Sequence, residues 1–165
     1  MAFALRLTVL LCGISGLLTG VWSFPKFRSK ANDCPKGWTQ LDCHCYIYQD
    51  DERTFADAES VCNILSGNLV SIHNALENAF VLELIRAGGN NDFAWIGLTD
   101  AIEEDDFIWT DGSKQDFLNF DNNGESSAAG NCVAIDEDDG LWYDEDCTDD
   151  EPFVCIRELF SLIHH

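Results

Sequence analysis

Apolar residues recur at helical spacing in two neighbouring parts of the chain. Thr54 opens the first segment, which Ser66-Gly67-Asn68 ends. Asn74 opens the second segment, which ends at Gly88-Gly89. Glu77 follows Asn74 by three residues, the spacing of a capping box at a helix start. The pattern therefore predicts two helices, one after the other.

Outside these segments, short apolar runs are typical of β-strands. A Pro-Lys-Gly turn after Cys34 comes before the first run, which favours a small disulfide-tied hairpin. Residues 110–132 show little regular pattern, and a loop this long in a compact domain is usually functional or disordered. The predicted strands are Tyr46–Tyr48, Phe93–Leu98, Phe107–Trp109, Cys132–Ile135, Leu141–Tyr143 and Phe153–Ile156.

The first residues have the pattern of a secretory signal peptide, with one early positive charge and an apolar run. The run is shorter than the roughly 20 residues of a membrane span, so an anchor is the weaker interpretation. We expect cleavage near Ser23 and a soluble, secreted product. The expected divisions are a signal peptide over 1–23, a basic arm over 24–32, one domain over 33–159 and a tail over 160–165.

The cysteine count indicates a disulfide framework in an oxidising compartment. Removing Cys12 with the signal peptide leaves seven cysteines, so one is either a free thiol or pairs with another chain. Zinc binding by Cys43-His44-Cys45 is a competing interpretation. Adjacent ligands do not easily surround one tetrahedral ion, which disfavours it.

Acidic residues dominate the expected domain. Between Asp33 and Glu158 there are 30 acidic residues and five basic ones, a net charge of −25, against −21 for the whole chain. Such a surface repels nucleic acid and anionic membranes, and it favours cations, calcium mineral or basic partners. Solubility alone is the simpler explanation.

Six motifs occur in an order that resembles the C-type lectin domain. They extend from Cys34 to about Glu158, and the resemblance implies an α+β fold with two helices, two small antiparallel sheets and a long loop region. The motifs are "CPKGW", the helix ending near Cys62, "WIGL" at 95–98, "WTDG" at 109–112, "CVAI" at 132–135 and "PFVCI" at 152–156.

The resemblance also implies how the cysteines pair. The implied disulfides are Cys34–Cys45, Cys62–Cys155 and Cys132–Cys147, with Cys45 chosen because an aromatic residue follows it. Cys43 is then the odd thiol, and we expect that it could join two chains as a homodimer.

In this family the long loop commonly holds calcium and a sugar, through Glu-Pro-Asn, an acidic residue before the next cysteine, and Trp-Asn-Asp. This sequence has Glu125-Ser126-Ser127, Gly130-Asn131 and Trp142-Tyr143-Asp144 at those places. A cis peptide bond before Ser126 would cost about 2.5–4 kcal/mol. The resemblance retains Glu125 and Asp144 as calcium ligands, a weak site because calcium needs six to eight oxygens.

The remaining candidates come from the same resemblance. Asp100 and Glu104 match a second calcium position, whose partners in the 125–131 loop are missing. Glu125, Ser127, Tyr143 and Asp144 are the candidate sugar-binding residues, with Tyr143 placed to stack on a sugar. Trp38, Trp95, Trp109 and Trp142 are expected in the core.

The sequence favours a binding protein over an enzyme. None of the four histidines lies in a nucleophile-base motif, and two of them end the chain. The first hypothesis is a secreted lectin of innate or mucosal defence that binds a glycan with weak or altered calcium dependence. The second is a lectin-like module for ice, calcium mineral or a protein.

Overall fold

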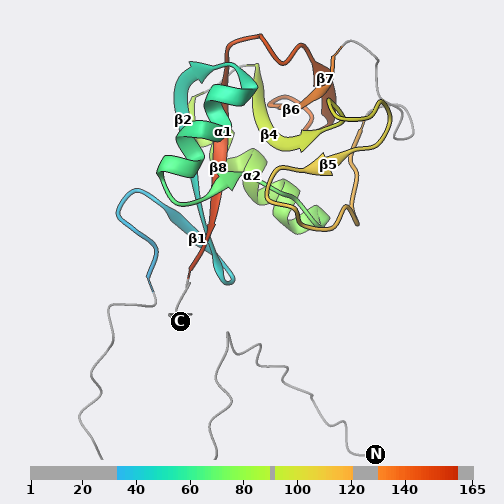
Figure 1. The fold of residues 1–165 in the computed structure, drawn as a ribbon. Helices are drawn as coiled ribbons and strands as arrows, with labels where there is room; N and C mark the ends of the chain where they lie inside the picture. Colours follow the sequence, from blue (N-terminus) through green and yellow to red (C-terminus); the bar gives the residue numbers. More distant parts are fainter. Residues whose placement is uncertain (1–32, 90–91, 121–129, 160–165) are drawn as a thin grey trace, which may run out of the picture.

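Strands β2 (His44–Arg53) and β8 (Glu151–Glu158) form a long antiparallel pair through the molecule (Figure 1). The computed structural model describes residues 33–89, 92–120 and 130–159. Within these residues the strands form one sheet in the order β1-β2-β8-β4-β6-β7. The remaining members are β1 (Thr39–Leu41), β3 (Asn68–Leu69) on β8, β4 (Phe93–Thr99), β5 (Ile108–Trp109) on β4, β6 (Cys132–Asp136) and β7 (Trp142–Glu145).

The sheet is made of two antiparallel halves joined by one parallel contact. One half contains β1, β2, β3 and β8, and the other contains β4 to β7. Trp95 of β4 pairs with Phe153 of β8 in parallel, and this pair joins the halves. The α+β fold class is confirmed, and the two sheets that the resemblance implies are continuous here.

Both helices begin and end where the sequence pattern predicts. Helix α1 (Phe55–Ile64) starts after Thr54, whose Oγ accepts the N–H of Asp57 at 3.4 Å. Helix α2 (Ala75–Gly88) starts after Asn74, whose Oδ1 accepts two N–H groups of the first turn. It ends at Gly89, where φ is 84°, a left-handed value that glycine adopts without strain.

The capping residue Glu77 works differently from the expected box. Its Oε2 accepts the N–H of His73, one residue before the cap, at 2.7 Å. Its Oε1 accepts from the side chain of Asn74 at 2.8 Å. Glu77 therefore fixes both the start of α2 and the segment that enters it.

Glu59 of α1 joins three elements, a role that the sequence did not reveal. Its two oxygens accept hydrogen bonds from the side chain of Asn68, the backbone of Leu69 and the hydroxyl of Thr110 at 2.7 to 3.1 Å. These bonds connect α1 to β3 and to the residue after β5. A half-buried carboxylate is well satisfied by this number of donors.

The core contains three of the four predicted tryptophans. Trp95, Trp109 and Trp142 are 0 to 2% exposed, as expected. Trp38 is only partly buried, and the Arg157 guanidinium lies over its ring at 5.7 Å from the ring centre. The prediction of a core position for Trp38 is therefore only partly right.

The structure contains the three disulfides that the resemblance implies: Cys34–Cys45, Cys62–Cys155 and Cys132–Cys147. Cys43 is disulfide-bonded as well, and no described cysteine is a free thiol. A free thiol at Cys43 is therefore not what the structure has, and the expected homodimer link through Cys43 stays a prediction.

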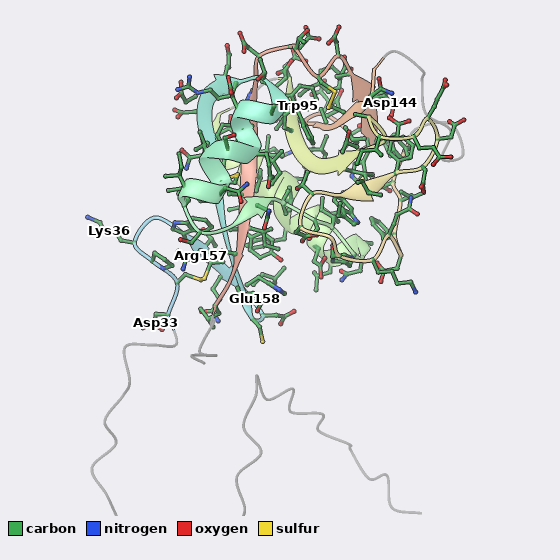
Figure 2. All side chains as sticks on the ribbon, in the orientation of Figure 1. Asp33, Lys36, Trp95, Asp144, Arg157 and Glu158 are labelled. Atoms are coloured by element: carbon green, nitrogen blue, oxygen red, sulfur yellow. A yellow bond between two sulfur atoms is a disulfide. The ribbon has the colours of Figure 1, made fainter. Side chains whose placement is uncertain are left out.

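The first and last described residues lie at the same end of the molecule. Figure 2 shows Asp33, Arg157 and Glu158 there, with Asp144 at the other end. The expected signal peptide, arm and tail lie outside the described residues. Neither of the two helices in the described part is long and apolar enough to cross a membrane.

Candidate functional site

Strands β4, β6 and β7 carry the described residues of the predicted calcium and sugar site. Asp100 follows β4, Asn131 precedes β6, and Asp144 lies in β7, paired with Val133 of β6. The Cys132–Cys147 disulfide joins the start of β6 to the segment after β7. Glu125 and Ser127, which the resemblance placed in this site, lie outside the described residues.

Asp100 is a buried carboxylate whose oxygens are occupied by hydrogen-bond donors of the protein. It is 4% exposed. Its Oδ1 accepts from the Asn131 side chain and its Oδ2 accepts the N–H of Asp105, each at 3.0 Å. The N–H of Asp100 also donates to the Asn131 carbonyl at 3.2 Å. Asp100 therefore organises the turn after β4 and fastens it to the segment before β6.

The residue type at position 131 decides this arrangement. The resemblance expects an acidic residue there, which would put a second carboxylate beside Asp100. Two carboxylates in one site repel each other unless a cation lies between them. Asn131 instead donates an N–H to Asp100. The amide therefore compensates this carboxylate with a hydrogen bond, where two carboxylates would need a cation between them.

Gly130 allows the chain to approach β7 closely. A Cβ atom built on Gly130 would lie 1.8 Å from the Glu145 carbonyl oxygen, which no other residue type could tolerate without a shift of the backbone. Thr99 holds the same segment, since its hydroxyl donates to the Asn131 carbonyl at 2.5 Å. Gly130-Asn131 is therefore a fixed part of the site.

Asp144 and Tyr143 lie on opposite faces of β7, because side chains alternate along a strand. Asp144 is 1% exposed and lies on the buried face with Trp142. Tyr143 is half-buried, its ring is edge-on to Phe93 at 5.6 Å, and its hydroxyl donates to Asp139 at 3.2 Å. The structure does not bring the two predicted sugar ligands together.

Glu104, the second residue of the other predicted calcium position, is exposed. It lies in the turn between β4 and β5, where Asp105 has a positive φ of 66°. The carboxylate of Asp100 accepts from Asp105 and Asn131, as described above. A calcium position shared by Asp100 and Glu104 stays a prediction.

A buried asparagine that the sequence analysis missed positions β7. Asn78 of α2 accepts from the indole N–H of Trp142 at 2.7 Å and donates to the Gly140 carbonyl at 3.0 Å. Asn78 interrupts the apolar face of α2, which is the signal that could have indicated it. Trp142 in turn meets the rings of Trp109, Phe117 and Phe120 at 5.6 to 5.8 Å, so the loop after β5 is packed against β7.

A second group of carboxylates lies near the start of β8. Burial raises the pKa of Glu151 to about 7, and the carboxylates of Asp92, Asp149, Glu145 and Glu52 add to the shift. The pKa of Glu145 is also raised, first by burial and then by Asp149, Asp144 and Asp92. No cationic side chain is among the groups that shift these two residues.

The described residues do not provide a calcium site. Within the parts of the chain that the structure covers, there is no group of three or more His, Cys, Asp or Glu side chains arranged to hold a metal. The bonding of Asp100 to Asn131 gives the local reason, since calcium needs several oxygens that are not already occupied by donors. The predicted calcium site includes Glu125, which lies outside the described residues, so it stays a prediction.

Comparison with known proteins identifies the family. The family model described as "Lectin C-type domain" matches residues 51–157, more than half of the chain. The chain belongs to the C-type lectin domain family, which confirms the resemblance.

Individual relatives agree with this family. The galactose-specific lectin nattectin of Thalassophryne nattereri is 41% identical over 88 residues, which are 53% of this chain and 55% of nattectin. The match thus spans about half of that relative's length. The crystal structure of human lithostathine has a TM-score of 0.73 at 33% identity, covering 84% of this chain and 98% of that one. Herring type II antifreeze protein has a TM-score of 0.70 at 27% identity, covering 77% and 100%.

Proposed function

We propose that this protein is a secreted, non-enzymatic carbohydrate-binding protein whose calcium dependence is weak or altered. Family membership supports the binding of a sugar, and nattectin, a relative at 41% identity, is named as galactose-specific. A galactose-type ligand is therefore the first to test.

The hydrogen bond between Asp100 and Asn131 is the observation that supports weak or altered calcium dependence. The Asn131 amide donates to the buried Asp100 carboxylate at 3.0 Å, so this carboxylate is compensated without an ion. Metal removal leaves these two groups paired. We therefore expect the loop segment before β6 to keep its conformation in a chelator.

A glycan array tests the proposal in calcium and in EGTA, with galactose-terminated glycans among the probes. We expect binding to galactose-type glycans that is largely retained in EGTA. Complete loss of glycan binding in EGTA would contradict the proposed weak calcium dependence. Absence of glycan binding in both buffers would contradict carbohydrate binding itself.

Two variants make the array more specific. Asp144→Asn removes the one buried carboxylate that remains from the family pattern in β7, and it should weaken glycan binding. Glu103→Gln removes an exposed carboxylate of the β4–β5 turn and serves as the matched control, with no expected effect. Near-ultraviolet circular dichroism checks that both variants are folded.

A second candidate function is binding to ice, calcium mineral or a protein. The likeness to herring antifreeze protein supports the ice alternative, as do the exposed apolar side chains of Ile102 and Ile108, which are 82% and 40% exposed. Assays of ice recrystallisation and of carbonate growth separate the alternatives. Inactivity in both assays would leave only a protein ligand.

A further inference from the structure

Strand β7, which carries Asp144, is the last strand of the sheet and pairs with β6 along one edge. Its other edge is covered at its first residue by the end of the segment that follows β5. The Trp142 N–H donates to the Asn119 carbonyl at 3.0 Å, and Phe120 forms an isolated parallel bridge with Trp142. Asn119 and Phe120 therefore fix the start of β7 from the side that lacks a partner strand.

The side chain of Asn119 makes a second connection at the same place. Its amide donates to the Gly140 carbonyl at 2.8 Å, in the turn between β6 and β7. The Asn78 amide of α2 donates to the same carbonyl at 3.0 Å, so both lone pairs of this oxygen are used. Asn119 is half-buried, and it joins the segment after β5 to the β6–β7 turn and, through Gly140, to α2.

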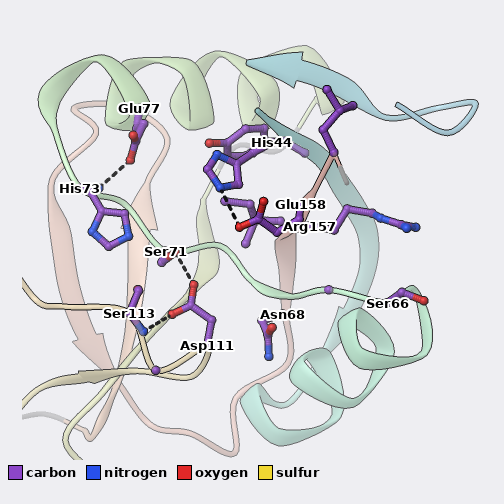
Figure 3. A pocket seen from close by; sticks show the side chains of 15 residues that line it. His44, Ser66, Asn68, Ser71, His73, Glu77, Asp111, Ser113, Arg157 and Glu158 are labelled. Atoms are coloured by element: carbon purple, nitrogen blue, oxygen red, sulfur yellow. Dashed lines mark hydrogen bonds and ion pairs between the residues drawn. The ribbon is translucent and has the colours of Figure 1, made fainter. Parts of the chain in front are cut away.

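The segment after β5 is also held at its beginning. Asp111 accepts the Ser71 hydroxyl at 2.6 Å and the N–H of Ser113 at 2.8 Å. Figure 3 shows Asp111 between these two residues, beside a polar cleft. Further along, the Nδ1 atom of His73 lies 2.9 Å from the Oδ1 atom of Asp116. The segment is therefore fixed to the chain that enters α2 before its last residues reach β7.

The position of Trp142 determines that of Asp144. Side chains two residues apart on a strand lie on the same face, and Trp142 and Asp144 are each 1% exposed. The Asn78 side chain accepts from the Trp142 indole, and the Asn119 backbone accepts from the Trp142 N–H. A rotation of β7 that moved Trp142 would move Asp144 with it.

We propose that Asn119 is a positioning residue for carbohydrate binding at β7. The inference rests on the proposed function and adds to it a residue that acts through Gly140 and Trp142, which set the direction of Asp144. Binding to groups that are already ordered avoids the entropy cost of ordering them, so loosening this connection weakens the affinity for the sugar.

The test compares two variants of Asn119 in an NMR titration of the ¹⁵N-labelled protein with lactose, a galactose-terminated disaccharide, in a buffer that contains calcium. Asn119→Ala removes the amide. Asn119→Asp keeps the shape of the side chain but places an acceptor, in place of the donor, beside the Gly140 carbonyl. We expect each variant to bind lactose about fivefold more weakly than the wild type, the effect of one lost hydrogen bond.

Two control variants separate positioning from stability. Asn63→Ala removes the same kind of amide from α1, where it donates to Glu59. Ile85→Val removes one buried methyl group from α2 and lowers the overall stability. We expect the lactose affinity of both controls to match that of the wild type.

Hydrogen exchange provides a readout that needs no sugar. The backbone amides of Trp142 and Asp144 should exchange faster in both Asn119 variants than in the wild type, because the edge of β7 opens more often. Asn63→Ala should leave the exchange of these two amides unchanged.

An unchanged lactose affinity in both Asn119 variants would overturn the inference, and so would a loss of affinity that Ile85→Val shares. Unchanged exchange at Trp142 and Asp144 would overturn it as well. A wild type that binds no galactose-terminated glycan would contradict the proposed function and this inference together, whereas a wild type that binds lactose no more tightly than the two Asn119 variants would contradict this inference alone.

Discussion

Two groups of carboxylates in this protein differ in how their negative charge is compensated. Asp100, beside β6, is buried and receives hydrogen bonds from the Asn131 amide and the Asp105 backbone. Glu151, at the start of β8, faces Asp92, Asp149 and Glu145 instead, and its pKa rises to about 7. The fold supplies hydrogen-bond donors to the first carboxylate, whereas other carboxylates surround the second and its pKa is raised.

This difference also bears on the acidic composition. A net charge of −21 suggests a protein that needs cations throughout. The two carboxylates do not share this need, because Asp100 already accepts from two protein donors while the half-buried Glu151 has other carboxylates around it. Four changes test this comparison, beginning with the largest expected effect.

The change Asn131→Asp should destabilise the protein most. It replaces the amide donor with a second carboxylate beside the buried Asp100, and we expect a loss of about 2–3 kcal/mol in the free energy of unfolding in EGTA. Excess calcium should restore part of the loss, because a cation can then bridge the two carboxylates. Chemical denaturation at neutral pH with and without calcium measures both effects.

The control for this change is Glu103→Gln, which alters an exposed carboxylate of the turn after Asp100. It should leave the stability within about 0.5 kcal/mol of the wild type. An Asn131→Asp variant that is as stable as the wild type in EGTA would show that the Asn131 amide is not what compensates Asp100.

The change Glu151→Gln should stabilise the protein above neutral pH. The folded-state pKa of Glu151, about 7, lies above its ordinary value of 4.5, so the folded state binds the proton more tightly than the unfolded state does. The resulting stabilisation is present at low pH and is lost as pH rises through about 7. With allowance for solvent screening, we expect a gain of about 1–2 kcal/mol for the variant near pH 8.

Denaturation of this variant and the wild type at several pH values measures the effect. The difference between them should be small below pH 4.5, the ordinary value for this group, and should grow as pH passes the raised value. A stability difference that does not vary with pH would show that folding does not raise the pKa of Glu151.

The change Asp149→Asn tests the repulsion within the second group. Asp149 is exposed and raises the pKa of both Glu151 and Glu145. Removing its charge should lower the pKa of Glu151 and stabilise the folded state by about 0.5 kcal/mol near pH 8. An NMR titration of the Glu151 side chain gives the pKa directly, and an unchanged value would mean that Asp149 does not contribute to the shift.

The smallest effect is expected for Tyr143→Phe. The change removes one hydrogen bond, from the Tyr143 hydroxyl to Asp139, and keeps the edge-on contact with Phe93. We expect a stability change within about 0.5 kcal/mol and unchanged glycan binding. Weaker glycan binding without unfolding would instead support the sugar-stacking role that the sequence suggested for Tyr143.

The sequence predicted the helices and strands well because their signals are local. Thr54 and Asn74 cap the two helices as expected, and Gly89 ends α2. Each predicted strand has a counterpart in the sheet. The motifs of a C-type lectin domain supplied what local signals could not, namely the pairing of six distant cysteines.

The site was harder to predict, because its properties depend on contacts between distant residues. Asn131 looked like a missing ligand, and its bond to Asp100 joins positions 31 residues apart. Asn78 was not singled out in the sequence, and its bond to Trp142 joins positions 64 residues apart. Tyr143 and Asp144 point to opposite faces because side chains alternate along β7. The family motif, by contrast, suggested that both belong to one set of ligands.

Calcium titration of the wild-type protein by calorimetry tests the central claim, that the Asn131 amide satisfies Asp100 in place of an ion. The account predicts no saturable binding tighter than about 1 mM for the wild type, and tighter binding for Asn131→Asp. Saturable calcium binding by the wild type well below that concentration, with Asn131→Asp no tighter, would contradict it.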